Sequence, residues 1–272
     1  MRKTLFSGIA ACLLATAATA AEQSPSVIWT VGQADRSASE FALAPDRFRD
    51  FLANDFGYED KYFLVGHSVP AADFPYVLPG PADTWGGTWP TSGWRTHQIN
   101  ILFGLKEIPS DGTCTLVVDL LDYAKNFLPL VKVSVNTQDA KFQLDAPGLS
   151  VADQRKPNQM EKIVDTLSIT GNLAKATPRR LEIPIRPGVL KAGGNEVTIT
   201  VLEGSWILFD RVSLEGPAGT NVEQPQQLFI RNIEAAPYEL ADGKRRVQPL
   251  LVDLEWLEGA PALSVELDDK EI

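Results

Sequence analysis

The chain has 272 residues, enough for one sizeable domain and a further piece, and its 44% apolar and 22% charged content is that of an ordinary globular protein. A formal net charge of −10 disfavours nucleic acid and anionic lipid as partners, because both carry charge of the same sign. Of the two cysteines, only Cys114 lies beyond the first twenty residues. The sequence beyond that point therefore excludes an internal disulfide and a cysteine-based metal site.

The first twenty residues have the parts of a secretory signal peptide. Arg2 and Lys3 are basic, residues 5–14 are largely apolar, and residues 18–20 read Ala-Thr-Ala, a cleavage signal. We therefore predict export to the periplasm or the extracellular space. A lipoprotein is the alternative, because the residues before Cys12 resemble a lipobox, although the apolar segment would then be very short. No other stretch approaches the roughly 20 apolar residues of a membrane span.

The mature chain opens with a predicted strand over residues 24–33, where alternate positions are apolar: Val27, Trp29 and Val31. A short amphipathic helix over residues 45–56 is expected next, since apolar residues recur at helical spacing: Phe48, Phe51, Leu52 and Phe56. We expect these phenylalanines to pack against the sheet. Residues 62–66 are the following strand.

Residues 66–96 are rich in Gly, Pro, Asp and Ser, which break regular structure, and they hold three of the six tryptophans: Trp85, Trp89 and Trp94. A long loop in a compact domain usually carries function or is packed by its own side chains. Tryptophan combines a flat apolar face with one N–H donor, which suits stacking on a pyranose ring. The loop therefore predicts an aromatic platform for a sugar. The alternative is that the tryptophans fold inward and pack the loop.

Two further candidates for sugar contacts follow this loop. The guanidinium of Arg95 can form paired hydrogen bonds to a uronate carboxylate, or it can form an ordinary salt bridge. His97 and His67 are the only histidines and flank the loop, where they would supply hydrogen bonds. Without residues 1–20 the chain has 23 Lys and Arg against 35 Asp and Glu, a charge of −12. A pectin-like ligand would therefore need local Arg or Lys contacts.

Alternating apolar residues predict further strands over residues 97–105, 113–123, 130–136 and 180–185, with a short one near Phe142. Residues 147–178 are poorly patterned, apart from a short helix around residues 160–167. Asp119 and Asp122 lie towards the end of their strand, where carboxylates could hold calcium. Two carboxylates are not a specific motif, so solvated strand-end residues are the simpler interpretation.

The stretch from residue 193 to residue 216 predicts a turn and two strands. Gly193 to Asn195 is the turn, and the second strand, from Trp206 to Leu214, is apolar on both faces, as in the interior of a sandwich. Asp210 lies in its middle. A buried carboxylate must be paired, so we expect it to accept hydrogen bonds from a neighbouring loop, with a sugar or metal contact as the alternative.

Three motifs resemble the third domain of rhamnogalacturonan lyases, the polysaccharide lyases of family 4. They are I-W-T-V-G followed by Asp35 near the start, R-x-x-x-I-P-x-x-x-x-x-L-x-x-G-G-N over residues 179–195, and W-x-x-F-D-x-x-x-L-E over residues 206–215. The resemblance covers residues 26–217 and implies an all-β fold, a jelly-roll (galactose-binding-like) β-sandwich with short helices. In those lyases the catalytic Lys and His lie in the first domain, which has no counterpart in this sequence. The resemblance thus implies a domain that is not catalytic by itself.

We divide the chain accordingly into a signal peptide (1–20), a sandwich domain (21–217), a linker (218–227) and a β-rich extension (228–272). The extension has a predicted turn at Asp242 and Gly243. It is either the beginning of a truncated second module or an added sheet that packs across the first domain.

The sequence thus predicts an exported, non-catalytic carbohydrate-binding protein that works beside a polysaccharide-degrading enzyme. Its ligand would be a polysaccharide or oligosaccharide of the rhamnogalacturonan or pectin type, and a catalytic module or subunit is its other expected partner. No cofactor is expected, while a structural calcium stays open without a specific motif. Two alternatives remain: an N-terminal fragment of a larger polysaccharide lyase or glycoside hydrolase, and a structural or interaction sandwich without sugar affinity. The predicted sugar site comprises Trp85, Trp89, Trp94, Arg95 and His97.

Overall fold

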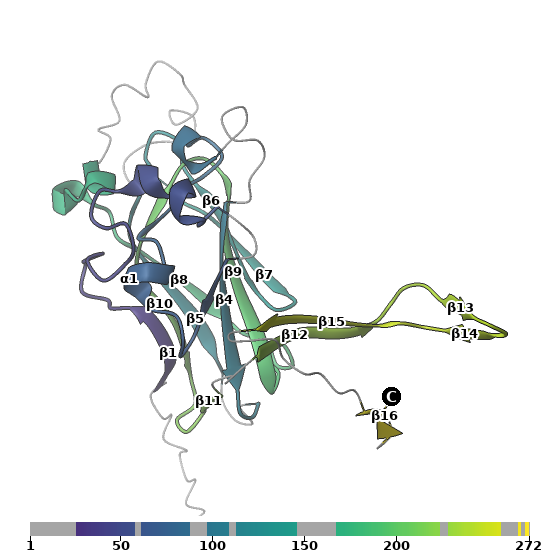
Figure 1. Cartoon of the computed structure of the whole chain (residues 1–272). Coiled ribbons are helices and arrows are strands. Elements are labelled where there is room, and N and C mark those ends of the chain that lie inside the picture. Colours follow the sequence, from purple (N-terminus) through teal and green to yellow (C-terminus); the bar gives the residue numbers. More distant parts are fainter. Residues whose placement is uncertain are drawn as a thin grey trace, which may run out of the picture.

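The structure, a computed structural model, describes residues 26–57, 61–87, 97–108, 113–145, 167–223 and 228–256 and two short C-terminal strands. Two β-sheets pack into a sandwich (Figure 1). The first, the five-stranded sheet, has the order β1-β10-β5-β8, with β3 beside β10. Its strands are β1 (Ser26–Gly32), β3 (Val77–Leu78), β5 (Thr115–Tyr123), β8 (Arg179–Pro184) and β10 (Ile207–Gly216).

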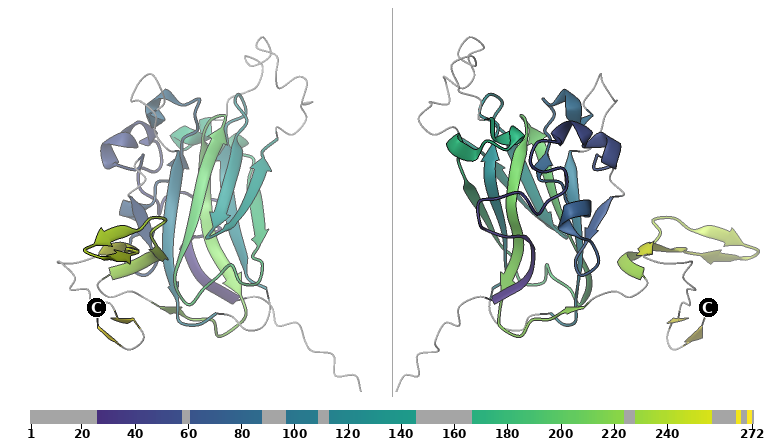
Figure 2. Two further views of the ribbon diagram at one scale, coloured as in Figure 1. Left: turned by 90° about the vertical axis from the view of Figure 1, so that its right-hand side faces the viewer. Right: turned by 60° about the vertical axis from the view of Figure 1, so that its left-hand side comes forward.

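The second, the six-stranded sheet, has the order β11-β4-β9-β6-β7, with β2 parallel to β4. Strands distant in sequence are neighbours in both sheets, which are otherwise antiparallel (Figure 2). The architecture confirms the all-β jelly-roll sandwich with short helices that the sequence predicts. The strands of this sheet are β2 (Tyr62–Leu64), β4 (Gln98–Leu105), β6 (Leu130–Val135), β7 (Gln138–Gln143), β9 (Gly193–Glu203) and β11 (Val222–Glu223).

Period-2 alternation builds the core between the sheets. On β6 and β9, alternate apolar residues are buried: Val131, Val133, Val135, Val197, Ile199 and Val201. The residues between them are polar, and all but Thr200 are only partly buried, among them Lys132, Ser134 and Thr198. Trp29 of β1 meets Phe103 of β4 across the sandwich, with ring centroids 5.2 Å apart. The six-stranded sheet is therefore apolar on its inner face and polar on its outer face.

The expected helix over residues 45–56 is instead two single 3₁₀ turns, η1 (Phe48–Asp50) and η2 (Leu52–Asn54). Leu43 and Asp55 adopt positive φ at either end of this segment, and its hydrogen bonds close single turns instead of a continuous helix. The packing prediction is nevertheless confirmed, because all three phenylalanines are buried: Phe48, Phe51 and Phe56. Beyond η2, the short helix α1 (Pro70–Asp73) leads to Phe74, which packs on Phe63 of β2 and Phe209 of β10 and so bridges the sheets.

The turn expected at Gly193–Asn195 is displaced. These residues already belong to β9, and the turn precedes them around Gly188. Gly193 does adopt the positive φ that the sequence predicts, at +78°. The buried side chain of Asn195 holds the turn in place: its amide donates to the Lys191 carbonyl at 2.8 Å and its oxygen accepts the Lys191 N–H at 3.0 Å. The turn is thus stabilised from inside the strand that follows it.

Asp210 behaves as the sequence predicts. It lies where the register of β10 shifts against β5, and its Oδ1 accepts a hydrogen bond from the backbone N–H of Arg36 at 3.0 Å. Arg36 belongs to the loop after β1. Burial raises the pKa of Asp210 to about 6, which this hydrogen bond partly offsets.

The interpretation of Asp119 and Asp122 as solvated strand-end residues is wrong, because both are buried. Arg180 and Arg211 donate to the carboxylate of Asp119 at 2.7 and 3.0 Å. Asp122 accepts hydrogen bonds from Lys125, Ser168 and the Thr177 backbone at 2.8, 2.6 and 3.0 Å. Apart from Lys125, the partners come from residues 168–180 and from β10, which the strand pattern alone does not place nearby. The helix expected around residues 160–167 lies outside the described residues except for Leu167, which begins η5 (Leu167–Thr170).

The extension forms a hairpin that runs away from the sandwich (Figure 1). Its base is anchored by Phe229, which packs on Leu64 and Leu102. A Cβ on Gly194 would collide with the backbone oxygen of Ile230, so a glycine of β9 permits this close approach. The predicted turn at Asp242–Gly243 is confirmed. The strands of the extension are β12 (Leu228–Ala235), β13 (Leu240–Asp242), β14 (Arg245–Val247), β15 (Leu250–Trp256), β16 (Glu266–Leu267) and β17 (Lys270–Glu271).

Candidate functional site

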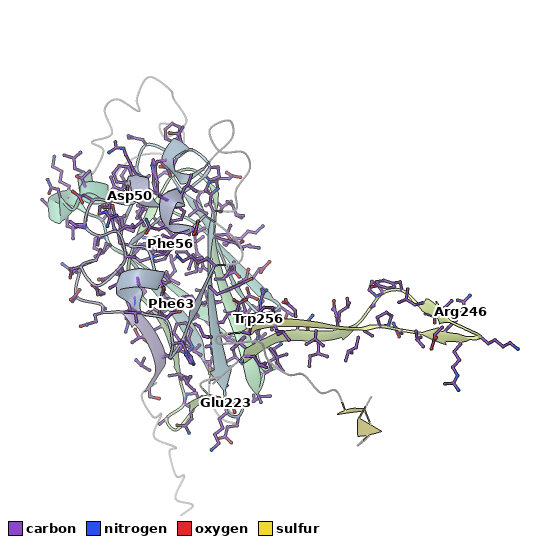
Figure 3. The ribbon with its side chains drawn as sticks, in the orientation of Figure 1. Asp50, Phe56, Phe63, Glu223, Arg246 and Trp256 are labelled. Atoms are coloured by element: carbon purple, nitrogen blue, oxygen red, sulfur yellow. The ribbon has the colours of Figure 1, made fainter. Side chains whose placement is uncertain are left out.

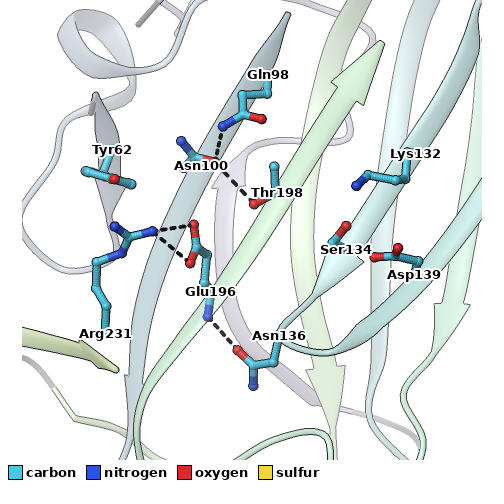
Figure 4. A pocket seen from close by; sticks show the side chains of 10 residues that line it. All are labelled: Tyr62, Gln98, Asn100, Lys132, Ser134, Asn136, Asp139, Glu196, Thr198 and Arg231. Atoms are coloured by element: carbon cyan, nitrogen blue, oxygen red, sulfur yellow. Dashed lines mark hydrogen bonds and ion pairs between the residues drawn. The ribbon is translucent and has the colours of Figure 1, made fainter. Parts of the chain in front are cut away.

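A polar groove of about 480 Å³ lies on the outer face of the six-stranded sheet (Figure 4). Most of its lining residues are the outward-facing residues of β4, β6 and β9, with further side chains from β2, β7, β12 and the β6–β7 turn. Every lining residue carries a polar group, and Tyr62 is the one aromatic side chain in the lining. The lining residues are Tyr62, Gln98, Asn100, Lys132, Ser134, Asn136, Asp139, Glu196, Thr198 and Arg231.

One wall of the groove is fixed by hydrogen bonds around Asn100 of β4. Gln98 donates its side-chain amide to the Asn100 oxygen at 3.3 Å, and the Thr198 hydroxyl donates to the same oxygen at 3.2 Å. Because Asn100 is almost fully buried, its amide orientation is set by these neighbours. The wall therefore presents amide and hydroxyl groups in a fixed arrangement, which suits hydrogen bonding to a polar ligand.

The extension contributes a cation to the groove through Arg231 of β12. Its guanidinium donates to both carboxylate oxygens of Glu196 at 3.1 Å and pairs with Asp253 at 3.2 Å. The same group lies 4.6 Å from the centroid of the Tyr62 ring (Figure 4). Burial raises the pKa of Tyr62, and the positive charge of Arg231 partly offsets that rise. Tyr62 and Glu196 are thus held in place by a residue that is not part of the sandwich.

The floor of the groove between β6 and β9 ends at Asn136. The Asn136 amide donates to the Val189 carbonyl at 2.7 Å and to the Asn195 side chain at 2.9 Å. Its oxygen accepts the backbone N–H of Glu196 at 2.9 Å. These bonds tie the β6–β7 turn, where Asn136 has φ +48°, to the beginning of β9. Three hydrogen bonds on one side chain leave this end of the groove rigid.

The other side of the groove carries Lys132, a cation without a described counter-ion, and a second lysine lies beside it on the same face of the sheet. Lys132 of β6 lies directly opposite Lys141 of β7 in the strand register, so the two side chains share the outer face. Among the residues that the structure describes, neither lysine has an ion pair or a hydrogen bond. Asp139 and Ser134, the next opposed pair, also line the groove. An acidic protein thus has a local cationic site on this face.

Of the sequence-predicted sugar-site residues, the structure describes Trp85 and His97. Trp85 is half-buried and packs edge-on against Phe48 and Phe51, at centroid distances of 5.1 and 6.1 Å. His97 is buried, its Nε2 has no hydrogen-bond partner in the described structure, and burial lowers its pKa, which keeps the ring neutral. Trp89, Trp94 and Arg95 lie outside the described residues.

Gly86, the neighbour of Trp85 in the chain, lies close to His97, because a Cβ on Gly86 would lie 3.8 Å from the His97 ring. His97 has the same parity as the inward-facing Ile99, whereas Gln98, the next residue, lines the groove. The aromatic platform over Trp85, Trp89 and Trp94 stays a prediction.

With this geometry in view, the comparison with protein families identifies the sandwich. A family model described as "CBM-like: Polysaccharide lyase family 4, domain III" matches residues 27–214, which include every strand of the sandwich except the beginning of β1, the end of β10 and β11. The chain belongs to this family. The resemblance noted in the sequence is therefore confirmed, and the groove is the outer face of a domain similar to carbohydrate-binding modules (CBMs).

Individual proteins add little to the domain III assignment. No curated protein matches the sequence. One of the matching solved structures is that of a family GH115 4-O-methyl-alpha-glucuronidase with specificity for decorated arabinogalactans. The two sequences are 18% identical, and the match covers 43% of this chain and 13% of that enzyme, with a TM-score of 0.24. The chain thus spans about an eighth of that enzyme, and at this TM-score the two do not share a demonstrated fold.

Sequence reasoning missed the groove of this domain III member, although a signal for it exists. Gln98 and Asn100 alternate with inward-facing Ile99 and Ile101, and polar residues alternate in the same way on β6 and β9. Each strand alone reads as an ordinary half-solvated strand. The groove forms only because β4, β9, β6 and β7 are neighbours in the sheet and because Arg231 of the extension completes its lining.

Two other features of the described residues bear on ligands and location. No group of three or more His, Cys, Asp or Glu side chains comes together there as the ligands of a metal ion would. Of the helices described, none has the length and apolar character of a membrane span.

Proposed function

We propose that the protein binds an acidic polysaccharide of the rhamnogalacturonan or pectin type in the groove of its six-stranded sheet, without cleaving it. The observation that carries the proposal is the opposed pair Lys132 and Lys141 on the outer face of a CBM-like sandwich. Two like charges face each other there, and no described anion pairs with them. A carboxylate on the ligand would relieve their repulsion and form charge-assisted hydrogen bonds.

The rest of the groove fits a sugar chain. Sugar hydroxyls both donate and accept hydrogen bonds, and the side chains of Gln98, Ser134 and Thr198 offer both kinds of group. Tyr62 adds the flat apolar surface on which a pyranose face can stack. The guanidinium of Arg231 lies over the Tyr62 ring, so the ring is ordered before a ligand binds.

A binding role without cleavage is supported by the state of the groove's carboxylates. Sugar-cleaving chemistry needs a carboxylate or another base that is free to accept a proton. Glu196 is held by both oxygens in the pair with Arg231, so Asp139 is the one carboxylate of the lining without a described ion pair, whereas hydrolysis of a glycosidic bond uses a pair of carboxyl groups. We therefore assign catalysis to a partner, a catalytic module or a separate polysaccharide-degrading enzyme that this protein assists.

Titration calorimetry of the mature protein against homogalacturonan, rhamnogalacturonan and neutral galactan tests this proposal. Lys132→Ala/Lys141→Ala should weaken binding of the acidic glycans at least about tenfold, because each lost charge-assisted bond is worth more than 1 kcal/mol. Lys175→Ala, which removes an exposed lysine outside the groove, is the matched control and should bind as the wild type does. Equal binding of neutral and acidic glycans would remove the role of the lysines, and no binding to any glycan would end the proposal.

The aromatic loop is a second candidate site, because Gln98, which lines the groove, follows it closely in the chain. In this arrangement Trp89, Trp94 and Arg95 would lengthen the binding surface, and Trp85 would anchor the loop through Phe48. Trp89→Ala/Trp94→Ala separates the two sites. Binding lost in this variant but retained in the lysine variant would move the ligand to the loop.

We also propose export through residues 1–20, which would place the protein where extracellular polysaccharide occurs. The signal-peptide pattern in the sequence is the support for this step. Cell fractionation and the mass of the purified protein test it. A mass that includes residues 1–20 or a lipid on Cys12 would contradict this proposal.

A further inference from the structure

The hairpin of β12 and β15 has one face that is entirely apolar. Opposed residues share a face, and faces alternate along each strand. The register, with its bulge between Ile230 and Asn232, places three apolar pairs on the same side: Ile230–Leu254 before the bulge, and Ile233–Val252 and Ala235–Leu250 beyond it. The pair at the base, Leu228 and Trp256, continues the series. No charged or hydrogen-bonding side chain interrupts this face except the N–H of Trp256.

The opposite face of the hairpin is the one attached to the sandwich. It carries Phe229, buried against the six-stranded sheet, and Arg231 and Asp253, which form the ion pairs at the groove. The apolar face therefore points away from the sandwich. Ile233 is 54% exposed and Trp256 is 60% exposed, so the described structure leaves this face to the solvent. Figure 3 shows Trp256 near the base of the hairpin and Arg246 at the far end.

This apolar face is expected to be buried against another surface. A two-stranded hairpin is marginally stable alone in water, and contiguous exposed apolar surface on a soluble protein marks an interaction site. The arm beyond the hairpin, formed by β13 and β14, adds three exposed apolar residues: Tyr238, Leu240 and Val247.

We propose that this face is a dimer interface between two copies of the chain, whose hairpins pack face to face and antiparallel around a twofold axis. This inference is independent of sugar binding. An uncharged apolar strip is complementary to itself, as a twofold interface requires, and two packed ribbons bury it from both sides. Antiparallel packing also brings the end of each arm to the sandwich of the other copy.

The charges support that arrangement. The end of the arm carries three consecutive cations over residues 244–246, and only Arg246 has a described ion pair, with Glu239. Residues 26–223 contain 18 Lys and Arg against 24 Asp and Glu, a charge of −6. In the dimer each basic arm end therefore approaches an acidic sandwich, an attraction that favours a second copy as the occupant.

Sedimentation velocity of the mature wild-type protein over a concentration series is the test, with thermal unfolding measured in parallel. Ile233→Thr/Val252→Thr keeps the strand preference of both positions but puts hydroxyls on the apolar face, and should raise the dimer dissociation constant at least about tenfold. Asn232→Thr/Glu234→Thr introduces two threonines on the opposite face instead. This variant should dimerise as the wild type does. A wild-type protein that stays monomeric throughout overturns the proposal, as does an unaffected Ile233→Thr/Val252→Thr variant.

A second variant tests the orientation of the two copies. Lys244→Glu/Arg245→Glu should weaken the dimer and reverse its dependence on salt, because the arm end would then repel the acidic sandwich. Dimerisation as tight as that of the wild type at low salt would overturn the antiparallel arrangement. Glycan affinity measured on the same variants should not change, so failure of the dimer and failure of sugar binding are distinguishable.

Discussion

Two clusters of charged residues, one on each sheet of the sandwich, are arranged in opposite ways. On the five-stranded sheet, Asp119 of β5 is paired with Arg180 and Arg211 at 2.7 and 3.0 Å. On the six-stranded sheet, Lys132 and Lys141 face one another with no described counter-ion. Charges of the first kind stabilise the fold, whereas those of the second kind cost stability and remain free for a ligand. The following predictions replace paired charges of the five-stranded sheet or unpaired charges of the six-stranded sheet and compare the effects.

The largest effect is expected for Asp122→Ala on the five-stranded sheet. Its fully buried carboxylate is 2.8 Å from the ammonium of Lys125 and 2.6 Å from the hydroxyl of Ser168. Removing it leaves the buried cation unpaired, so the free energy of unfolding should fall by about 3–5 kcal/mol. Chemical denaturation followed by tryptophan fluorescence measures this loss.

Asp139→Ala on the six-stranded sheet is the matched control for that variant. Asp139 is exposed and has no described ion pair, so its replacement should change the unfolding free energy by less than about 0.5 kcal/mol. Similar losses for Asp122→Ala and Asp139→Ala would show that the two sheets do not differ in this way.

The next effect is a pH dependence that originates at Asp210. Because burial raises the pKa of this carboxyl to about 6 in the folded protein, the folded state holds the proton more tightly than the unfolded state does. The unfolding free energy should therefore fall as the pH rises from about 4 through 6, by up to about 3 kcal/mol. Asp210→Asn keeps an acceptor for the Arg36 N–H and should abolish this fall.

Asp119 is expected to act in the opposite direction, which provides an internal comparison. Burial alone would raise its pKa, but hydrogen bonds from Arg180 and Arg211 outweigh burial and lower the pKa. Its stabilising contribution is therefore present at neutral pH and is lost as the pH falls through the lowered pKa. Denaturation curves from pH 3 to pH 7 for Asp210→Asn and Asp119→Asn separate the two; the same slope in both variants would contradict this assignment.

The contrast between the two clusters also explains which features of the structure could be predicted from the sequence. Alternation around Ile99, Val133 and Ile199 is a local property, so the strands and the β-sandwich class could be predicted from it. The pairing of Asp210 followed from the cost of an unpaired buried carboxylate. The burial of Asp119 and Asp122 did not follow, because their partners come from segments that only the folded chain brings near.

The groove required information that no single segment contains. Lys132 and Lys141 become neighbours only through the β6–β7 register, and Arg231 reaches Glu196 from outside the sandwich. The tryptophan-rich loop is recognisable in the sequence because its composition is unusual, whereas the residues of the groove are common in any half-exposed strand. A binding site made of ordinary residues depends on which strands are adjacent, and this order is the least local property of a β-fold.

A smaller effect on stability is expected where the extension packs on the six-stranded sheet. In Gly194→Ala, the added Cβ collides with the backbone oxygen of Ile230, which should weaken docking of the hairpin by about 1–3 kcal/mol. Hydrogen exchange of the amides of β12 should accelerate accordingly. Gly104→Ala is the matched comparison, because its Cβ would collide with Glu223 of β11 instead. Faster exchange in β12 for Gly104→Ala but not for Gly194→Ala would contradict the assignment of the two contacts.

The smallest effect has the opposite sign. Lys141→Ala removes one of the two opposed cations, so the unfolding free energy should rise by about 0.2–1 kcal/mol, more at low salt than at high salt. Lys175→Ala, outside the groove, should change it by less than about 0.5 kcal/mol, without that salt dependence. A gain in stability together with a loss of affinity for acidic glycans would show that the lysine pair is retained for the ligand at the expense of the fold. If Lys141→Ala instead destabilises the protein, Lys141 contributes to folding, and the six-stranded sheet uses its charges as the five-stranded sheet does.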